Sequence, residues 1–555
     1  MLLLNLDLLA TASGGVARLR ELILTLAVQG KLVSQDPAEE SASALLQKIR
    51  AKKDRLIGEG KIKRDKPVAE ISDEEKPFRL PAGWVWVRFG DASINRDAER
   101  IPVSSSDRET RAKTYDYYGA SGVIDKIDGF LFDKTLLLIG EDGANLINRS
   151  TPIAFLAHGK YWVNNHAHVI DTTHPELMTY LALSINAISL EPYVTGTAQP
   201  KMNQAKLNGI VIALPPLAEQ CRIVARVEEL MRLCDALEAK VQLETTQHAQ
   251  LVNTLLGRLT VSTTPEELAD NWQRVSQHFD LLLDRPEAID ALEQTLLQLA
   301  VRGLLVHQDA SDEPASTLLA RIRFEKDLLI AEGKIKRDKP LPPITEQEQP
   351  FELPVGWEWA RLGEIMLISS GVTLGRKTAI PSPVTLPYLR VANVQRWHLN
   401  LSSMKEVVID QSELERFQLL SGDLLITEGG DWDKVGRTAI WRNELEFCLH
   451  QNHVFKARGI SPDWNSVWAE LYLNSGDARV YFASSAKQTT NLASINMTQL
   501  KNCAFPVPPI AEQSRIVTRV TALRRLCADL RQRLKAAQAT QSHLAQALVE
   551  SSNAL

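Results

Sequence analysis

Cysteine is scarce in this 555-residue chain, which has five such residues and no Cys-x-x-Cys pair. They are odd in number and far apart: Cys221, Cys234, Cys448, Cys503 and Cys527. A disulfide framework or a structural zinc site needs closely spaced, paired cysteines, so both are disfavoured. We expect reduced cysteines buried in hydrophobic cores.

The sequence also lacks an apolar run of membrane-spanning length, which is roughly 20 residues. Its first nine residues are apolar, but Asn5 and Asp7 interrupt them and no basic segment precedes them, unlike a secretory signal. We therefore expect a helix to start here, no membrane association and a cytoplasmic location.

An excess of positive charge is missing as well, since 63 Lys and Arg stand against 68 Asp and Glu, for a net charge of -5. Nucleic-acid-binding domains are often basic, so the composition alone argues against one. The objection is weak, because affinity for DNA depends on where basic residues cluster and on what a partner subunit adds.

Motifs for phosphate or methyl transfer are missing too. The segment from Gly371 to Lys377 approaches a phosphate-binding loop, but its glycines are misspaced. The Pro-Pro pairs follow Leu214, Leu341 and Val507, without the Asn or Asp that an amino-methyltransferase has there. We expect neither nucleotide hydrolysis nor methyl transfer from this chain.

Candidate metal ligands are present but poorly arranged. An acidic cluster approaches the pattern of metal-dependent nucleases, although Trp432 stands where that pattern needs an acid. The cluster consists of Asp423, Glu428, Asp431, Asp433 and Lys434. Two histidine pairs lack a third ligand at a recognisable spacing, namely His166 with His168 and His450 with His453. Turn-forming acids and strand or loop histidines are the favoured interpretation, so we predict a non-catalytic chain that binds no metal or cofactor.

What the sequence does have is an internal repeat with two offsets. Residues 6–91 reappear in step at 279–364, and Glu59 to Pro67 recurs unchanged 273 positions later. A second repeat pairs 214–224 with 507–517, now 293 positions apart. A period this long is not that of a solenoid. It indicates a pseudo-two-fold chain, like a symmetric dimer fused head to tail.

Two inserts, at about 92–202 and 365–495, separate the repeated blocks, and we find no register that aligns them. Both contain short apolar runs bounded by Gly, Asp and Asn, which are typical of strands; examples are 136–139, 168–170, 424–426 and 454–456. Each insert is predicted to be a small α/β or mostly β module, so one duplicated frame carries two unlike inserts.

Each second repeat opens a long segment without Gly or Pro, at 217–256 and 510–555. Apolar residues recur there in steps of four and three, at Ile223, Val227, Leu230, Cys234, Leu237 and Val241 and at Ile516, Val520, Leu523, Cys527, Leu530 and Leu534. The repeated seam predicts two helices of roughly 60 Å that pack on each other antiparallel. An ordinary amphipathic core helix is the alternative.

The block before each insert reads as two helices, at 19–32 and 42–57 and again at 292–305 and 315–330, followed by a basic loop. Gly60 and Gly333 suit helix stops. The loops carry Lys61, Lys63 and Arg64 and, in the second copy, Lys334, Lys336 and Arg337. These cations are candidates for contact with DNA phosphates or a partner, and a solvated turn is the alternative.

Polar side chains suited to reading base edges are scattered through the insert loops. They are Tyr117, Lys126, Arg149, Asn164 and His166 in the first insert and Arg390, Asn393, Arg396, Arg437, Gln451 and Asn452 in the second. A polar elbow near each insert's end adds Thr197, Gln199 and Lys201, and Lys487, Gln488, Thr489 and Asn491. Each elbow leads into an Asn, Asn203 or Asn496, which suits either a loop presented to a ligand or a helix cap.

Together these features closely resemble the specificity subunit of type I restriction-modification systems, in particular the IB branch. The doubled Leu-Pro-Pro-Leu-Ala-Glu-Gln-type helix start, the doubled basic loop and the Pro-x-Gly-Trp-x-Trp strand carry the resemblance, over essentially the whole chain. It implies that each insert is a target recognition domain that reads half of a bipartite, asymmetric sequence in double-stranded DNA. It also implies that the helical frame sets the unread gap.

The resemblance further implies partners. Two modification subunits would bring S-adenosylmethionine, and restriction or translocase subunits would use ATP with Mg²⁺. The docking surface would include the basic loops together with Leu217, Glu219, Arg222, Ile510, Glu512 and Arg515.

The expected fold is α+β, with two globular α/β target recognition domains separated by long antiparallel coiled-coil helices in a pseudo-two-fold repeat. We expect a helical block at 1–91, recognition domain 1 at 92–207, a spacer helix at 208–257, a second helical block at 258–364, recognition domain 2 at 365–500 and a spacer helix at 501–555. A protein-binding scaffold without DNA affinity, or an enzyme with an unrecognised site, would be the competing interpretations.

Overall fold

A computed structural model of the protein describes residues 6–62, 64, 68–196, 199–262, 264–375, 380–430, 434–489 and 492–554. The chain divides into two compact units. Unit 1 comprises residues 1–245 and 537–555, and unit 2 comprises residues 246–536. None of the helices in the described part of the chain has an apolar stretch of membrane-spanning length.

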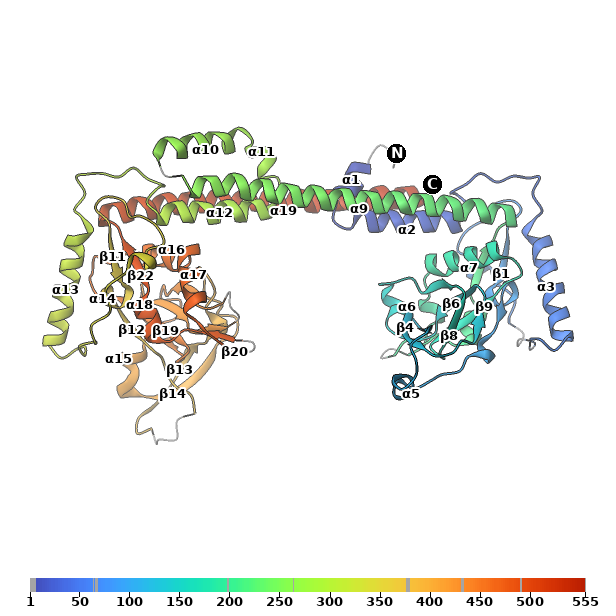
Figure 1. Ribbon diagram of the computed structural model, residues 1–555, viewed down its shortest axis with the longest axis horizontal. Coiled ribbons are helices and arrows are strands. Elements are labelled where there is room, and N and C mark those ends of the chain that lie inside the picture. Colours follow the sequence, from blue (N-terminus) through green and yellow to red (C-terminus); the bar gives the residue numbers. More distant parts are fainter. Residues whose placement is uncertain are drawn as a thin grey trace. The chain divides into compact units, whose positions relative to one another are not determined.

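Unit 1 combines helices with a strand-rich insert (Figure 1). Its helices are α1 (Leu6–Thr11), α2 (Gly15–Val28), α3 (Ala42–Gly58), α4 (Phe89–Ala92), α5 (Ser105–Glu109), α6 (Asn145–Asn148), α7 (Pro175–Ala187), α8 (Gln204–Asn208) and the first part of α9 (Leu217–Thr260). Its strands are β1 (Val85–Arg88), β2 (Ile94–Asn95), β3 (Tyr115–Gly119), β4 (Gly122–Ile127), β5 (Phe132–Asp133), β6 (Leu136–Gly140), β7 (Ala154–Ala157), β8 (Lys160–Val163), β9 (Ala167–Asp171) and β10 (Val211–Leu214).

Unit 2 has the same plan. Its helices are α10 (Pro265–Gln277), α11 (Phe279–Leu282), α12 (Pro286–Val301), α13 (Ala315–Ala331), α14 (Leu362–Ile365), α15 (Leu414–Phe417), α16 (Ser466–Leu473), α17 (Gly476–Ser485), α18 (Met497–Asn502) and most of α19 (Ile510–Ala554). Its strands are β11 (Glu358–Arg361), β12 (Met366–Ser369), β13 (Pro383–Leu389), β14 (Lys405–Asp410), β15 (Leu424–Thr427), β16 (Gly429–Gly430), β17 (Thr438–Ile440), β18 (Leu449–His450), β19 (Val454–Gly459), β20 (Lys487–Thr489), β21 (Leu492–Ser494) and β22 (Ala504–Val507).

The two inserts share a sheet topology, which corrects the prediction that no register relates them. The main sheet has the order β2-β9-β6-β7 in unit 1 and β12-β19-β15-β17 in unit 2. A second sheet in each unit pairs an antiparallel neighbour and a parallel neighbour with its central strand, as β4-β3-β8 and β14-β13-β18. Leu137 opposes Ile170 on β6 and β9, and Leu424 opposes Ala457 on β15 and β19. Leu424 lies 287 residues after Leu137, and Ala457 lies 287 residues after Ile170, so one offset relates these strands.

Each insert begins and ends on two paired strands. Val85 on β1 opposes Leu214 on β10, and Glu358 on β11 opposes Val507 on β22. Arg88, the last residue of β1, is buried beside β10. Its guanidinium donates to the Glu75 carboxylate at 2.7 and 2.9 Å. Arg361 binds Glu348 in the same way, with both distances 2.8 Å. A bidentate ion pair between a buried arginine and a partly exposed glutamate therefore fixes the base of each insert.

The long helices contribute to both units, α9 from unit 1 into unit 2 and α19 from unit 2 back into unit 1. In unit 1 the seam residues Ile223, Val227 and Cys234 share a core with α2, which runs along α9 (Figure 1). In unit 2 Cys527 shares a core with α12 and with the last turns of α9, near Leu256. The seam of α19 also meets the end of α9 in unit 2, as predicted, but a repeat-block helix packs into each seam in addition.

Two smaller predictions need correction. The helices predicted to reach Leu32 and Leu305 end at Val28 and Val301, because Gly30 and Gly303 adopt left-handed conformations with φ of 70° and 71°. Four cysteines are buried as predicted, but Cys221 is exposed because it lies off the apolar seam of α9.

Candidate nucleic-acid interface

Three loops meet at one end of an inner strand of each main sheet, β6 in unit 1 and β15 in unit 2. In unit 1 the N–H of Glu141, directly after β6, donates to the carbonyl of His166, directly before β9, at 2.8 Å. The N–H of Met202, at the end of the elbow, donates to the Glu141 carbonyl at 2.8 Å. This arrangement, which we call the junction of unit 1, fixes the elbow against the loops on either side.

The junction of unit 2 has the same two hydrogen bonds. The Glu428 N–H donates to the His453 carbonyl at 3.0 Å, and the Ile495 N–H donates to the Glu428 carbonyl at 2.9 Å. Glu141 and Glu428, and likewise His166 and His453, are therefore equivalent. The candidate interface is duplicated in structure although the inserts differ in most of their sequence.

A histidine and a carboxylate form a pair at each junction. His166 Nδ1 lies 2.7 Å from Asp142 Oδ2, and His453 Nδ1 lies 2.6 Å from Glu428 Oε2. The two imidazoles are 51% and 55% exposed, whereas their carboxylate partners are 29% and 28% exposed. Each ring is held by the protein at Nδ1 and is otherwise half open to solvent.

Ion pairs surround the junction of unit 1. The Glu141 carboxylate accepts from Arg100 at 2.9 Å and lies 3.3 Å from Lys201 Nζ. Behind it, buried His168 lies 2.6 Å from Asp97 Oδ2 through Nδ1 and 2.8 Å from the Met202 carbonyl through Nε2. Burial alone would raise the pKa of Asp97, but the hydrogen bond and charge of His168 and the charge of Arg100 outweigh it and lower that pKa.

The junction of unit 2 is built from different neighbours. Its elbow is a hairpin of β20 and β21, and Gly429 and Ser494 pair where unit 1 has Asp142 and Lys201. Buried His450 donates from Nδ1 to the Val454 carbonyl at 2.7 Å, and burial lowers its pKa to about 4. His450 is thus a neutral core residue, in agreement with the structural interpretation of the His450 and His453 pair.

The structure brings only some of the predicted reading residues of insert 1 to the junction. His166, Gln199 and Lys201 are exposed there. Asn164 is buried and its Oδ1 accepts from the His166 N–H at 2.8 Å, so it shapes the turn. Thr197 lies outside the described residues.

The other three candidates of insert 1 lie elsewhere. Tyr117 is buried with its hydroxyl bound to the backbone of Val103, and Lys126 is exposed on β4 beside Asp116. The Arg149 guanidinium donates to the carbonyls of Ile185 and Ile188 at 3.2 and 2.6 Å, which anchors the end of α7. Tyr117 and Arg149 therefore have structural roles.

In insert 2, Gln451, Asn452 and Lys487 lie at the junction, with Gln488 and Thr489 on β20. Asn491 lies outside the described residues. Asn393 is buried, and three arginines bind neighbouring groups: Arg390 the Ser403 carbonyl, Arg396 the Asn474 side chain and Arg437 the Gln395 side chain. Asn203 and Asn496 cap α8 and α18, so the capping interpretation of these two residues is confirmed.

The equivalence of the two junctions was not predicted, although the sequence carries a signal for it. Ile139-Gly140-Glu141-Asp142-Gly143 corresponds to Ile426-Thr427-Glu428-Gly429-Gly430 at the 287-residue offset. At the same offset, Asn164-Asn165-His166 corresponds to Gln451-Asn452-His453. Asp142 was not singled out, and Glu428 and His453 were considered only as metal ligands.

The predicted docking residues Glu219 and Glu512 have an internal role. Each is 1% exposed and accepts the indole N–H of a tryptophan at 2.9 Å, Trp84 for Glu219 and Trp357 for Glu512. Burial raises the pKa of both carboxylates, which the hydrogen bonds only partly offset. Because these carboxylates face inward, they hold the helix start on the Pro-x-Gly-Trp strand and do not form the predicted outer surface.

The other predicted docking residues lie nearer the surface. Arg222 binds Glu39, and Arg515 binds Asp312 at 2.6 Å, so both link a long helix to the preceding repeat block. Leu217 and Ile510 are half-buried. These contacts leave parts of all four side chains accessible.

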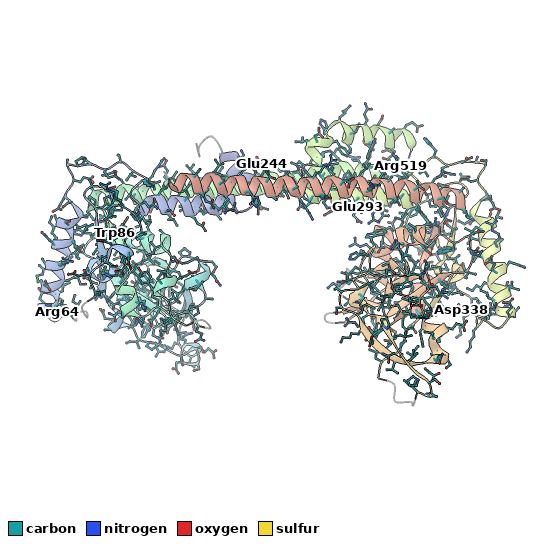
Figure 2. All side chains as sticks on the ribbon, turned by 180° about the vertical axis from the view of Figure 1, so that it is seen from behind. Arg64, Trp86, Glu244, Glu293, Asp338 and Arg519 are labelled. Atoms are coloured by element: carbon teal, nitrogen blue, oxygen red, sulfur yellow. The ribbon has the colours of Figure 1, made fainter. Side chains whose placement is uncertain are left out.

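The basic loops extend beyond α3 and α13. Lys61 and Lys334 each lie 2.8 Å from the glutamate two positions earlier, and both are about two-thirds exposed. Arg64 lies past the end of α3, where it is exposed (Figure 2), and Lys336 and Arg337 are exposed in unit 2. Lys63 lies outside the described residues.

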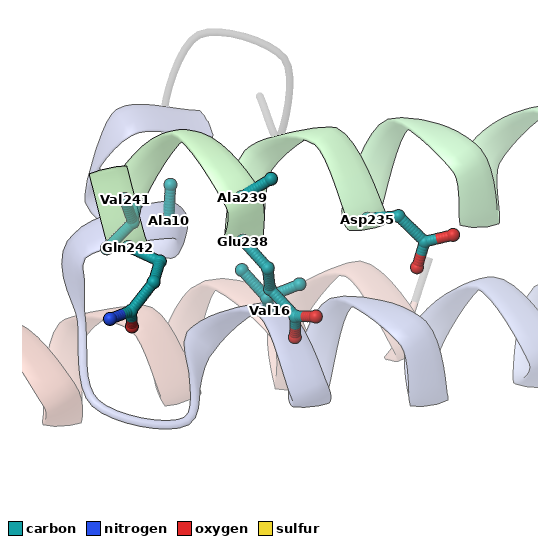
Figure 3. A pocket seen from close by; sticks show the side chains of 7 residues that line it. All are labelled: Ala10, Val16, Asp235, Glu238, Ala239, Val241 and Gln242. Atoms are coloured by element: carbon teal, nitrogen blue, oxygen red, sulfur yellow. The ribbon is translucent and has the colours of Figure 1, made fainter. Parts of the chain in front are cut away.

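A cavity of about 570 Å³ lies among the helices of unit 1 (Figure 3). Its lining includes Asp235, Glu238 and Gln242 of α9 and Val16 of α2. The two carboxylates make it an unfavourable site for nucleic acid.

No group of three His, Cys, Asp or Glu side chains is placed to hold a metal ion within the residues that the structure describes. In the acidic cluster, Asp423 is buried and binds Arg458 at 2.6 and 2.7 Å. Asp431, Trp432 and Asp433 lie outside the described residues.

Comparisons with known proteins place these features in context. A family described as the type I restriction modification DNA specificity domain matches residues 81–247 and 354–537. The EcoEI and EcoAI type I restriction enzyme specificity subunits of Escherichia coli are each 37% identical to this chain, with 97% of the chain and 93% of the relative covered. A solved chain from a study of complex assembly in a type I R-M system is 18% identical, covers 86% of this chain and 99% of its own, and has a TM-score of 0.45.

Proposed function

This chain belongs to the family of type I restriction-modification specificity subunits, and we propose that each of its two inserts reads one half of a bipartite, asymmetric DNA target. The duplicated junction is the observation that carries this proposal. One backbone arrangement recurs in both units, while the side chains around it differ. The inserts at 92–207 and 365–500 would thus be two recognition domains with the same fold, each with its own preferred DNA sequence.

The differences at the junctions support two distinct half-sites. In unit 1 the exposed groups include Gln199 and Lys201. In unit 2 the elbow has an exposed Lys487, and Gln451 occupies the position of Asn164. Amide side chains suit adenine and cations suit guanine in the major groove, so different sets select different bases.

We further propose that other subunits supply the chemistry. Two modification subunits would bind S-adenosylmethionine and methylate adenines, and restriction subunits would consume ATP with Mg²⁺. The basic loops, together with Leu217, Arg222, Ile510 and Arg515, are the proposed docking positions on this chain. The described cations of the basic loops are exposed in both units, and the other four side chains are partly accessible at equivalent places. This supports a surface that meets two copies of one partner.

An exchange of inserts tests the proposal. Residues 92–207 are replaced by the corresponding insert of another family member, and the complex with modification subunits is expressed in a host whose methylated adenines are then mapped. One half of the target should change and the other half should persist. Exchange of 365–500 is the matched experiment and should alter the opposite half. A change in both halves after either exchange contradicts independent readers.

A further inference from the structure

We propose that His166 and His453 form the same contact in both units, a hydrogen bond from the imidazole to a DNA phosphate that does not depend on base sequence. The proposal rests on the function proposed above. It assigns these residues to positioning the DNA on each reader, and it leaves base selection to their neighbours.

The first support is the equivalence of the two residues. His166 and His453 directly precede β9 and β19, and each accepts the N–H of the equivalent Glu141 or Glu428 on its carbonyl. The backbone therefore presents both imidazoles at one place on the common fold. The residues near them differ between the units: Lys201 in unit 1 and Ser494 in unit 2 occupy equivalent positions of the elbow.

The second support is the way each ring is held. Asp142 in unit 1 and Glu428 in unit 2 accept from Nδ1, although these acids are one position apart in the alignment of the junctions. The pairing is thus retained while its carboxylate comes from a different position. A carboxylate that binds Nδ1 orients the ring and leaves Nε2 for another partner.

The third support concerns what a shared residue can recognise. Two recognition domains that bind different half-sites contact different bases, but both contact the same sugar-phosphate backbone. A residue retained in both is suited to the constant feature. An imidazole that donates from Nδ1 to a carboxylate can also donate from Nε2 only as the imidazolium ion, so the contact would place a positive charge on the phosphate.

The test uses the complete complex with modification subunits at a mildly acidic pH of about 6. Binding is measured for wild type, His166→Ala, His453→Ala and the double variant. Two duplexes serve as probes, one with the target sequence and one with both half-sites scrambled. Each single variant should weaken binding to both duplexes by the same factor, about tenfold. It should also reduce the slope of log K against log salt by about 0.9.

His158→Ala is the matched control. His158 is exposed in unit 1 and lies beside Thr135, next to the opposite end of β6 from Glu141. Its removal should change neither binding nor salt dependence. His166→Lys retains a cation at the site and should keep most of the affinity for the scrambled duplex, which a purely structural histidine would not allow.

Several outcomes would overturn the inference. Unchanged binding of both duplexes would show that the imidazoles touch no DNA, and a loss confined to the target duplex would make them base readers. A loss that lysine does not restore would make them structural. The wild-type complex separates this inference from the proposed function: if it fails to prefer its target over the scrambled duplex, the proposed function fails, whatever the variants do.

Discussion

Arg20 and Glu293 occupy the same position in the two repeat blocks, and they carry opposite charges. Arg20 on α2 donates to Glu238 on α9 at 3.0 Å. Glu293 on α12 accepts from Arg531 on α19 at 2.9 Å, and position 531 is the equivalent of 238. The polarity of the pair is reversed between the units. Each repeat block is thus matched to its own long helix, because the exchanged partnerships would place like charges together.

Reversing one charge should weaken unit 1. Arg20→Glu would place a carboxylate beside Asp235 and Glu238, which now bind Arg20 at 2.6 and 3.0 Å. These groups are partly exposed, so we expect a loss of only about 0.5–1 kcal/mol in the free energy of unfolding. Urea unfolding of the purified chain measures it.

The double variant Arg20→Glu with Glu238→Arg should recover part of that loss, since Asp235 would still face the new glutamate. Additive effects of the two substitutions would show that the pair contributes no coupling.

Removal of the buried carboxylate at the start of α9 should cost more. Glu219→Leu deprives the Trp84 indole of its acceptor at 2.9 Å, and an unsatisfied buried donor costs about 1–3 kcal/mol. Glu512→Leu should have a similar effect through Trp357. Denaturant unfolding, followed by tryptophan fluorescence, provides the measurement.

An exposed glutamate on the same helix gives the control. Glu228→Leu should change stability by less than about 0.5 kcal/mol. The combination of Glu219→Leu with Trp84→Phe should cost less than the sum of its parts, because donor and acceptor are removed together. If the free-energy costs of the two substitutions were fully additive, the proposed hydrogen bond between Trp84 and Glu219 would be contradicted.

The ion pairs at the base of each insert predict an acid-sensitive stability. The hydrogen bonds from Arg88 and Arg361 lower the pKa of Glu75 and of Glu348 to about 2, from an ordinary value near 4.5. Acids with a lowered pKa stabilise the folded state above pH 4.5, and this contribution disappears as the pH falls toward 2. Melting temperatures of wild type and of Glu75→Gln with Glu348→Gln, measured between pH 7 and pH 2, test it.

The wild type should melt higher at pH 6, and the difference should shrink steadily below pH 4.5. A constant difference at all pH values would mean that the two glutamates do not act through their charge.

Lengthening both long helices should change the spacing of the target. Four residues inserted in α9 between Leu237 and Leu256, together with four at the equivalent place in α19, add about 6 Å of helix. That length corresponds to roughly two base pairs, so the unread gap should widen while both half-sites persist. Mapping of methylated adenines measures the length of the gap and the sequences of the half-sites. An unchanged gap would show that these helices do not set it.

The sequence predicts the duplicated frame well because repetition is visible without any structure. The helices after the Pro-Pro pairs, the glycine stops at Gly60 and Gly333 and the strands at 136–139 and 424–426 are confirmed. In these segments local signals and the core agree, since the apolar period and the turn residues point to the same element.

Other features could not be predicted because they depend on contacts distant in sequence. The equivalence of Glu141 with Glu428 is hidden because the offset changes from 273 to 287 and then to 293, so no single register spans the inserts. The partner of each apolar seam was also hidden, since a period of 3.5 residues states which face is buried but not what covers it. Burial of Tyr117 and Asn393 was missed because a polar residue in a loop sequence looks the same whether it reads a ligand or supports a turn.

The paired strands at the base of each insert have an evolutionary consequence. Because Val85 lies opposite Leu214 and Glu358 opposite Val507, the two ends of each reader are neighbours, and the intervening gene segment is a self-contained cassette. Recombination within the repeated segments on either side would replace one cassette without disturbing the rest. The repeated flanks would thus provide a route to new target sequences by crossover, even between the two halves of a single gene.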